Sequence, residues 1–254
     1  MDEKTLGDLQ AEHMPPPRSR LDRPPGEVDE QSSYRNYVRD LILGFNDGLV
    51  SVYAACAGLA GAGFAAQSTG VAGAAAAVAG ALSMGLGEYV STQSQAQYYE
   101  SEARRERAHI KAYPELERQE LREMLDGKGY PPNVVDDLVA HLSKDESKFV
   151  DFMMREEFGV GKESDRSPWA AMVLVMVAFA LGSSLAVLPF FLPLGDRHLA
   201  VATAAAVGGL FLAGAGKGLV SGIPWLRSGL QMAILGSAAA AFTYWIGTLF
   251  NLQI

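Results

Sequence analysis

The sequence predicts an all-α, polytopic membrane protein with five transmembrane helices and a cytoplasmic three-helix insert. Two observations support this fold class. Charged residues are dense between Ser91 and Pro168 and almost absent from long stretches on either side. Each of those stretches can also hold at least one helix of about 20 residues, the length that crosses roughly 30 Å of hydrocarbon. The uncharged runs are 48–87, 167–195, 198–216 and 228–254.

The first uncharged run is longer than one span requires, and it must hold two. Glycine and small polar residues between 61 and 70 predict a turn in its middle. The expected spans are about 37–62, 70–96, 168–193, 198–217 and 228–250.

The same pattern divides the chain into four parts. A polar, proline-rich tail over 1–33 is expected to be disordered and contains no cleavable signal. Spans one and two occupy 34–96, the charged insert occupies 97–166, and spans three to five occupy 167–254.

The distribution of Lys and Arg predicts the orientation. Basic residues lie in the tail, in the insert and around the fourth connection, where Lys217 and Arg227 stand, whereas the opposite side has only Arg197. By the positive-inside rule, the N-terminus and the insert are cytoplasmic. Spans rich in Ala and Gly, without a recognisable sorting signal, favour a prokaryotic cell membrane, with a vacuolar membrane as the alternative.

Charge also indicates the kind of partner. The net charge of −8 lies in the water-exposed parts, which argues against nucleic acid and leaves cations as the natural ligand. The single cysteine, Cys56, lies within the first span and excludes an internal disulfide.

The insert is predicted to fold as three helices, at about 91–112, 115–127 and 133–158, separated by prolines. The first is expected to continue straight from the second span. Acidic, imidazole and thioether side chains recur on each helix at spacings of three and four residues, which places them on one face. The candidate metal ligands are Glu102, Glu106, His109, Glu117, Glu120, Met153, Met154 and Glu157.

This mixture of ligands suits Fe(II), Co(II), Mn(II) or Zn(II) better than Mg or Ca, which prefer oxygen throughout. The alternative for each helix alone is a solvated face, in which the acids alternate with arginines such as Arg104 and Arg105.

Three carboxylates fall within or next to the predicted spans, where a charge costs on the order of 3 kcal/mol. Asp40 and Asp47 are two helical turns apart and share a face, while Met84 and Glu88 form an i, i+4 pair on the second span. These four residues are the candidates for a transport path. Asp40 could instead form an interfacial ion pair with its neighbour Arg39, and Glu88 could reach water at the interface.

Two glycines accompany the aspartates on the first span. Gly44 and Gly48 form a small-xxx-small pair, which would let another helix approach closely.

Four separated stretches resemble the vacuolar iron transporter family. They are Arg39–Gly48 (RDLILGFNDG), Ala81–Ser91 (ALSMGLGEYVS), Asp151–Arg155 (DFMMR) and Arg227–Leu230 (RSGL). The resemblance runs from about Tyr34 to Phe250, and several motifs in the same order make it specific.

The resemblance implies a homodimer of five-span subunits that moves Fe(II) out of the cytosol in exchange for protons, with the insert gathering the metal. It assigns Asp47 and Met84 to the path. The insert ligands that it implies are Glu106, His109, Glu117, Glu120, Met153, Met154 and Glu157. Two positions depart from the family pattern. His109 replaces a glutamate, which could shift the preference toward Zn or Co, and Ala76 replaces a carboxylate, which leaves Glu88 as the only acid of the second span.

Two other classes compete with a transporter. A membrane-anchored metal-storage or metal-sensing protein would need one span and no intramembrane acids. An enzyme is not expected, because the sequence shows no zinc-hydrolase helix, P-loop or nucleophile–base pair.

Overall fold

A computed structural model describes residues 27–157 and 166–250; side chains are described from Tyr37 onward. Within these ranges the chain forms only helices and their connections. The α-helices are α2 (Glu27–Gly61), α3 (Ala66–Ala112), α4 (Pro114–Gly127), α5 (Pro132–Leu142), α6 (Glu146–Glu157), α7 (Pro168–Val187), α8 (His198–Ser221) and α9 (Trp225–Leu249). Short 3-10 turns, η3 (Leu188–Phe191) and η4 (Gly195–Arg197), connect α7 to α8.

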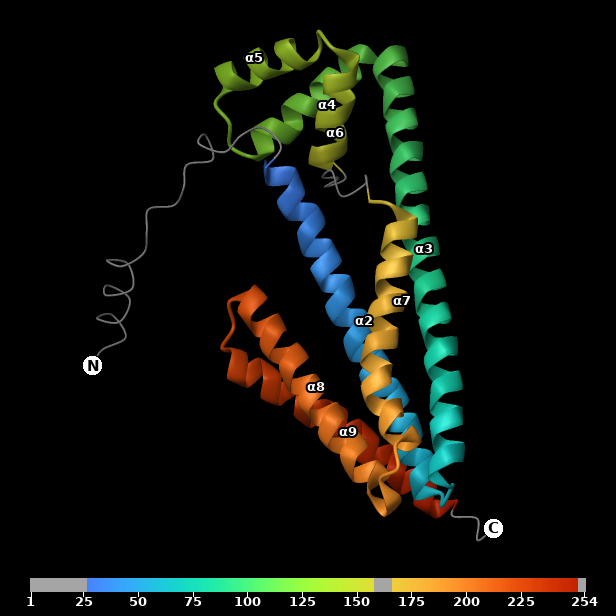
Figure 1. Cartoon of the computed structure of the whole chain (residues 1–254). Coiled ribbons are helices and arrows are strands. Elements are labelled where there is room, and N and C mark those ends of the chain that lie inside the picture. Colours follow the sequence, from blue (N-terminus) through green and yellow to red (C-terminus); the bar gives the residue numbers. More distant parts are fainter. Residues whose placement is uncertain (1–26, 158–165, 251–254) are drawn as a thin grey trace, which may run out of the picture.

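Five of these helices are long and apolar enough to cross a membrane, which confirms the predicted number of spans. They are α2, α3, α7, α8 and α9. Helices α2, α3 and α7 pack together, while α8 and α9 form a hairpin that joins them mainly through α2 (Figure 1). The insert lies at the end where α2 begins, and α9 ends at the opposite end, as an odd number of spans requires (Figure 1).

The first helix and the first turn differ in position from the predicted ones. Helix α2 begins at Glu27, within the segment expected to be a disordered tail, and residues 1–26 of that tail lie outside the described part of the chain. The first turn is shorter than predicted, because α2 ends at Gly61 and α3 begins at Ala66. The polar residues at 67–69 belong to the first turn of α3, and Gly70 packs beneath the aromatic rings of η3.

Helix α3 confirms the expected continuity between the second span and the insert, since it runs for 47 residues without a break. The predicted third insert helix at 133–158 is wrong. It is two helices, α5 and α6, separated by Ser143–Asp145. Asp145 caps the start of α6, because its carboxylate accepts the backbone N–H groups of Ser147 and Lys148 at 3.0 and 3.3 Å. The insert therefore has three separate helices packed beside the end of α3.

In the membrane part, α2 and α7 approach each other very closely. A Cβ added to Gly48 would stand 2.2 Å from the carbonyl oxygen of Phe179, and one added to Gly182 would stand 2.1 Å from that of Phe45. Gly44 faces the same helix. This confirms that the glycine pair admits a neighbouring helix, and identifies α7 as that helix.

The spans and the insert have separate apolar cores. In the spans, Leu49, Val52, Phe179 and Leu210 are among the buried members. In the insert, Leu121, Leu125, Val139 and Phe149 are buried together. The insert is thus a packed helical unit carried on the extended end of α3.

Candidate metal-collecting site and membrane carboxylates

The acids predicted on the insert gather where α3, α4 and α6 meet. Glu106 of α3 and Glu117 of α4 are both buried. Burial raises the pKa of Glu106 to about 7, and the charges of Glu117, Glu157 and Glu120 raise it further in the same direction. A carboxyl in these surroundings exchanges its proton near neutral pH.

Glu157, at the end of α6, belongs to the same group. Burial raises its pKa, and so do the charges of Glu120 and Glu117, while Arg105 opposes them. Glu102 lies at the edge of the group, where its carboxylate pairs with Arg105 at 3.5 Å. The solvated-face alternative therefore fits Glu102 better than it fits the buried Glu106 and Glu117.

His109 extends the group along α3. Its Nδ1 lies 3.5 Å from Oε1 of Glu117. Together with Glu120 and Glu123, these two residues line an open hollow of about 500 Å³ between α3 and α4. The hollow gives water and ions access to the acids.

The two methionines of α6 differ in their surroundings. Met153 is fully buried in the apolar core of the insert, packed with residues such as Leu121 and Phe149. Met154 is also buried but is not part of that core. Met154 is therefore the methionine whose thioether the apolar core of the insert does not already engage.

Among the described residues, no three His, Cys, Asp or Glu side chains converge closely enough to hold one metal ion. Like charges brought together in a partly dry environment repel one another and favour protonation. Small rotamer changes of Glu106, Glu117, Glu120 and Glu157 would be needed to coordinate a cation.

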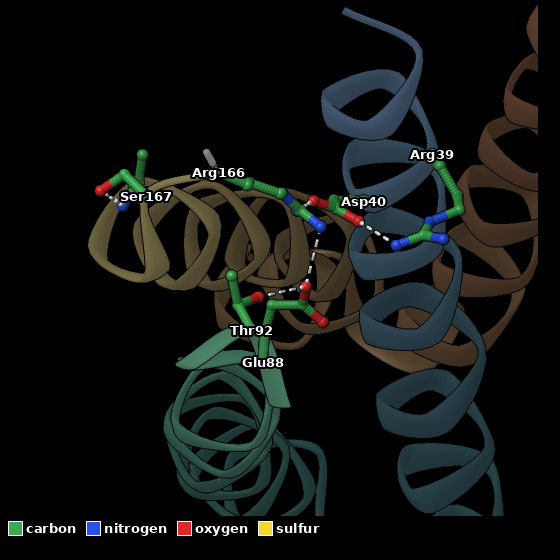
Figure 2. A network of polar contacts seen from close by, with 7 residues as sticks. Arg39, Asp40, Glu88, Thr92, Arg166 and Ser167 are labelled. Carbon is green, nitrogen blue, oxygen red and sulfur yellow. Dashed lines mark hydrogen bonds and ion pairs between the residues drawn. The ribbon is translucent and has the colours of Figure 1, made fainter. Parts of the chain in front are cut away.

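In the membrane part, Asp40 of α2 and Glu88 of α3 are joined through Arg166, which precedes α7 (Figure 2). One guanidinium nitrogen of Arg166 makes a close ion pair with Oδ2 of Asp40, and the other lies 3.2 Å from Oε1 of Glu88. We call these three residues the carboxylate bridge. Asp40 is almost completely buried, with 1% of its surface exposed, so it is not simply a surface partner of Arg39.

Two further contacts surround the carboxylate bridge. Arg39 lies 3.5 Å from the other oxygen of Asp40, but its side chain is 66% exposed. The hydroxyl of Thr92 donates to Oε1 of Glu88 at 3.3 Å (Figure 2). Glu88 therefore has a charged partner inside the protein, whereas the sequence left open that it simply reaches water.

Asp47 and Met84 lie deeper in the spans than the carboxylate bridge. Asp47 is seven residues beyond Asp40 on α2, about 10 Å along the axis, and Met84 is about 6 Å beyond Glu88 on α3. Met84 is half-buried against the core of the spans, and Ala76, two turns further on, is also half-buried. Asp47 is exposed on the surface of the single subunit.

Arg166 is a residue that sequence reasoning missed. It is one of many charges in the insert, but it stands two residues before the third span. Its position as the last cation before an apolar run is the sequence feature that could have identified it.

An all-helical protein with five spans, carboxylates at one end of those spans and an acid-rich water-exposed insert at the same end belongs to the class of cation-transporting membrane proteins. Comparison with known families agrees. The chain belongs to the VIT family, the vacuolar iron transporters, whose family pattern matches residues 38–248. It is therefore a transporter rather than an enzyme.

Relatives from distant organisms support this membership. The vacuolar iron transporter of Centaurea cyanus is 34% identical over 208 residues, which are 82% of this chain and 85% of that protein. Vacuolar iron transporter 1 of Arabidopsis thaliana is 35% identical over 208 residues, 82% and 83% of the two chains. The vacuolar iron transporter of Toxoplasma gondii is 29% identical over 229 residues, 86% and 76%.

Proposed function

We propose that this protein carries Fe(II) across a membrane, from the side that holds the insert to the opposite side, in exchange for protons. The insert side is the cytosol, according to the distribution of Lys and Arg. The membrane is a prokaryotic cell membrane or, as in the names of the relatives, a vacuolar one.

One observation carries this proposal: a single unbroken helix, α3, bears members of both groups of candidate metal ligands. Glu106 and Glu88 are 18 residues apart on it, about 27 Å along the axis. An ion released from the insert can therefore follow one helix face to the carboxylates of the membrane part.

The insert is the collecting site in this proposal. Glu106, Glu117, Glu120 and Glu157 supply the charge, with His109, Met154 and the more peripheral Glu102 as neighbours. Imidazole and thioether ligands favour Fe(II) over Mg and Ca and would also accept Zn, Co or Mn. Met153 contributes mainly by packing, since it lies within the apolar core.

The path through the membrane requires a second subunit. A carboxylate that faces lipid costs on the order of 3 kcal/mol, yet Asp47 is exposed on the single subunit. We therefore propose a homodimer in which Asp47 faces a polar path that the partner helps to enclose. Asp47 and Met84 would bind the largely dehydrated ion, and protonation of Asp47 from the far side would release it.

Sealed vesicles containing the purified protein test this function. With Fe(II) on the insert side and an acidic far side, we expect metal to accumulate at the far side and protons to leave it. A storage or sensing protein would bind metal at the membrane without accumulating it across the membrane, and transport unaffected by the pH gradient would contradict proton exchange.

A further inference from the structure

We propose that Arg166 is a tethered counter-ion at the entrance of the path, which holds Asp40 and Glu88 while no metal is present and which the incoming divalent cation must displace. Arg166 would thereby set the metal concentration at which ions enter. This inference rests on the proposed transport function, but its test measures binding independently of transport.

The first argument is the geometry of the carboxylate bridge. Arg166 contacts acids from two different spans, Asp40 of α2 and Glu88 of α3, through its two terminal nitrogens (Figure 2). A guanidinium presents a planar fork that suits this double contact. A divalent cation that binds the same two acids needs the same oxygens, so the arginine and the metal exclude one another.

The second argument is charge. The two carboxylates carry two negative charges, which one divalent cation would neutralise. The Arg166 side chain is only 12% exposed, whereas Arg39 is 66% exposed. Because water screens the exposed pair strongly, Arg166 supplies most of the local neutralisation. Removing Arg166 would leave a buried, under-compensated acid pair with high affinity for cations.

The third argument is that Arg166 has a further partner besides the two acids. While it pairs with them, its guanidinium carbon also lies 5.7 Å from the centre of the Tyr37 ring, within the range of a cation–π contact. The next residue, Ser167, accepts the N–H of Ala170 at 3.4 Å and so anchors the start of α7. When a cation takes the carboxylate oxygens, Arg166 would thus keep its contact with the ring, and the start of α7 would stay in place.

A tethered cation also favours multivalent ions. Because Arg166 is attached beside its acids, its effective concentration there is high, and a weakly bound monovalent ion would not displace it. A divalent transition metal gains more electrostatic energy from binding two carboxylates than a guanidinium does, because the single charge of the guanidinium is delocalised. The arginine would thus keep the entrance closed to Na⁺ and K⁺.

The test uses the full-length protein carrying Glu106→Ala, Glu117→Ala and Glu120→Ala, which removes three of the four main acids of the collecting site. Co(II) is the probe in calorimetry. We expect Arg166→Gln in this background to bind Co(II) about tenfold more tightly. The matched control is Arg39→Gln, which removes an exposed arginine from the same acid and should change affinity far less. Adding Asp40→Asn to Arg166→Gln should abolish the gain.

Equal Co(II) affinities of the Arg166→Gln and Arg39→Gln variants would overturn the proposal and make Arg166 only a structural link between α2, α3 and α7. If Arg166→Gln does not fold, the Co(II) affinity of Arg166→Lys tests the proposal instead. A lysine keeps the charge but lacks the fork, so it should hold one acid at a time and allow tighter Co(II) binding than arginine does. Unchanged binding in that variant would also overturn the proposal.

A transport readout separates this inference from the proposed function. With the insert intact, Arg166→Gln should lower the KM for Fe(II) in vesicles severalfold. If the parent protein moves no metal but Arg166→Gln still gains Co(II) affinity, the proposed function fails and the counter-ion role stands. An unchanged or raised KM in a protein that does transport would contradict the counter-ion role.

Discussion

At the scale of single residues, two aspartates on one helix face have opposite surroundings. Asp40 is buried and paired with arginine, whereas Asp47, two turns further on, is exposed and has no ion pair among the described residues. Periodicity correctly placed them on one face. It could not distinguish them, because the partner of Asp40 comes from a position 126 residues away in sequence, Arg166.

Asp47→Asn should abolish Fe(II) transport while leaving an assembled protein. Asparagine keeps the volume but loses the charge and the exchangeable proton, both of which the proposed path requires. Transport into vesicles and the elution volume in size-exclusion chromatography measure the two outcomes. Wild-type rates in this variant would remove Asp47 from the path.

Glu88→Gln should weaken transport and reduce its response to an imposed pH gradient, because Ala76 carries no proton and Glu88 is the only acid of the second span. Glutamine would also weaken the contact with Arg166, so thermal unfolding should be followed beside transport. If the variant keeps the wild-type rate and pH response, Glu88 has only a structural role. The exchanged proton would then be carried by Asp47 alone.

At the scale of elements, the predictable features were those that local sequence determines. Apolar runs gave the five spans, and the absence of Gly and Pro from 97–109 gave the continuous α3. The break between α5 and α6 was missed because no proline or glycine marks it. The local signal is a single carboxylate, Asp145, which caps the start of α6, and such a residue also occurs within helices.

The contact between α2 and α7 gives a stability prediction. Gly48→Ala should destabilise the protein by about 1–3 kcal/mol, the usual cost of overpacking, because its Cβ would stand 2.2 Å from the carbonyl oxygen of Phe179. Thermal unfolding in detergent measures the change. Gly87→Ala is the matched control, since nothing lies within 4 Å of its added Cβ, and an equal loss there would contradict the packing argument.

The insert is expected to supply ions rather than to drive the coupling, because it lies in water beyond the barrier. Replacing Glu106, Glu117 and Glu120 together by Ala should lower Fe(II) uptake chiefly at low metal concentration. Rates measured over a wide range of Fe(II) check this. Complete loss at saturating metal would show instead that the insert gates the membrane path.

At the scale of the whole molecule, the proposed collecting site and the proposed path are separate in space, but α3 contributes residues to both. The sequence indicated the candidate ligands of each by residue type and spacing. It could not indicate that Glu106 and Glu117 would be buried together, since that depends on how α4 folds back against α3 at Pro114. Because this burial raises the pKa of Glu106, metal binding to the insert is expected to depend on pH near neutrality.

The pKa of Glu106 is raised from 4.5 to about 7, so the folded protein holds this proton over a range in which the unfolded chain has lost it. The protonated group therefore favours the fold fully below pH 4.5, and this contribution is lost as the pH rises through about 7. Metal binding has the opposite dependence, because a ligand carboxylate must lose its proton first.

Fe(II) or Co(II) affinity of the insert should thus fall by up to about tenfold per pH unit below the pKa of Glu106, with about one proton released per ion at pH 6 and fewer at pH 8. Calorimetry in two buffers of different ionisation enthalpy measures the protons released. In Glu106→Gln, which carries no proton there, binding should be weaker at pH 8 and its dependence on pH between 6 and 8 should flatten. A variant with the same proton release as the parent would assign that proton to another acid, Glu157 being the nearest candidate because burial and its acidic neighbours also raise its pKa.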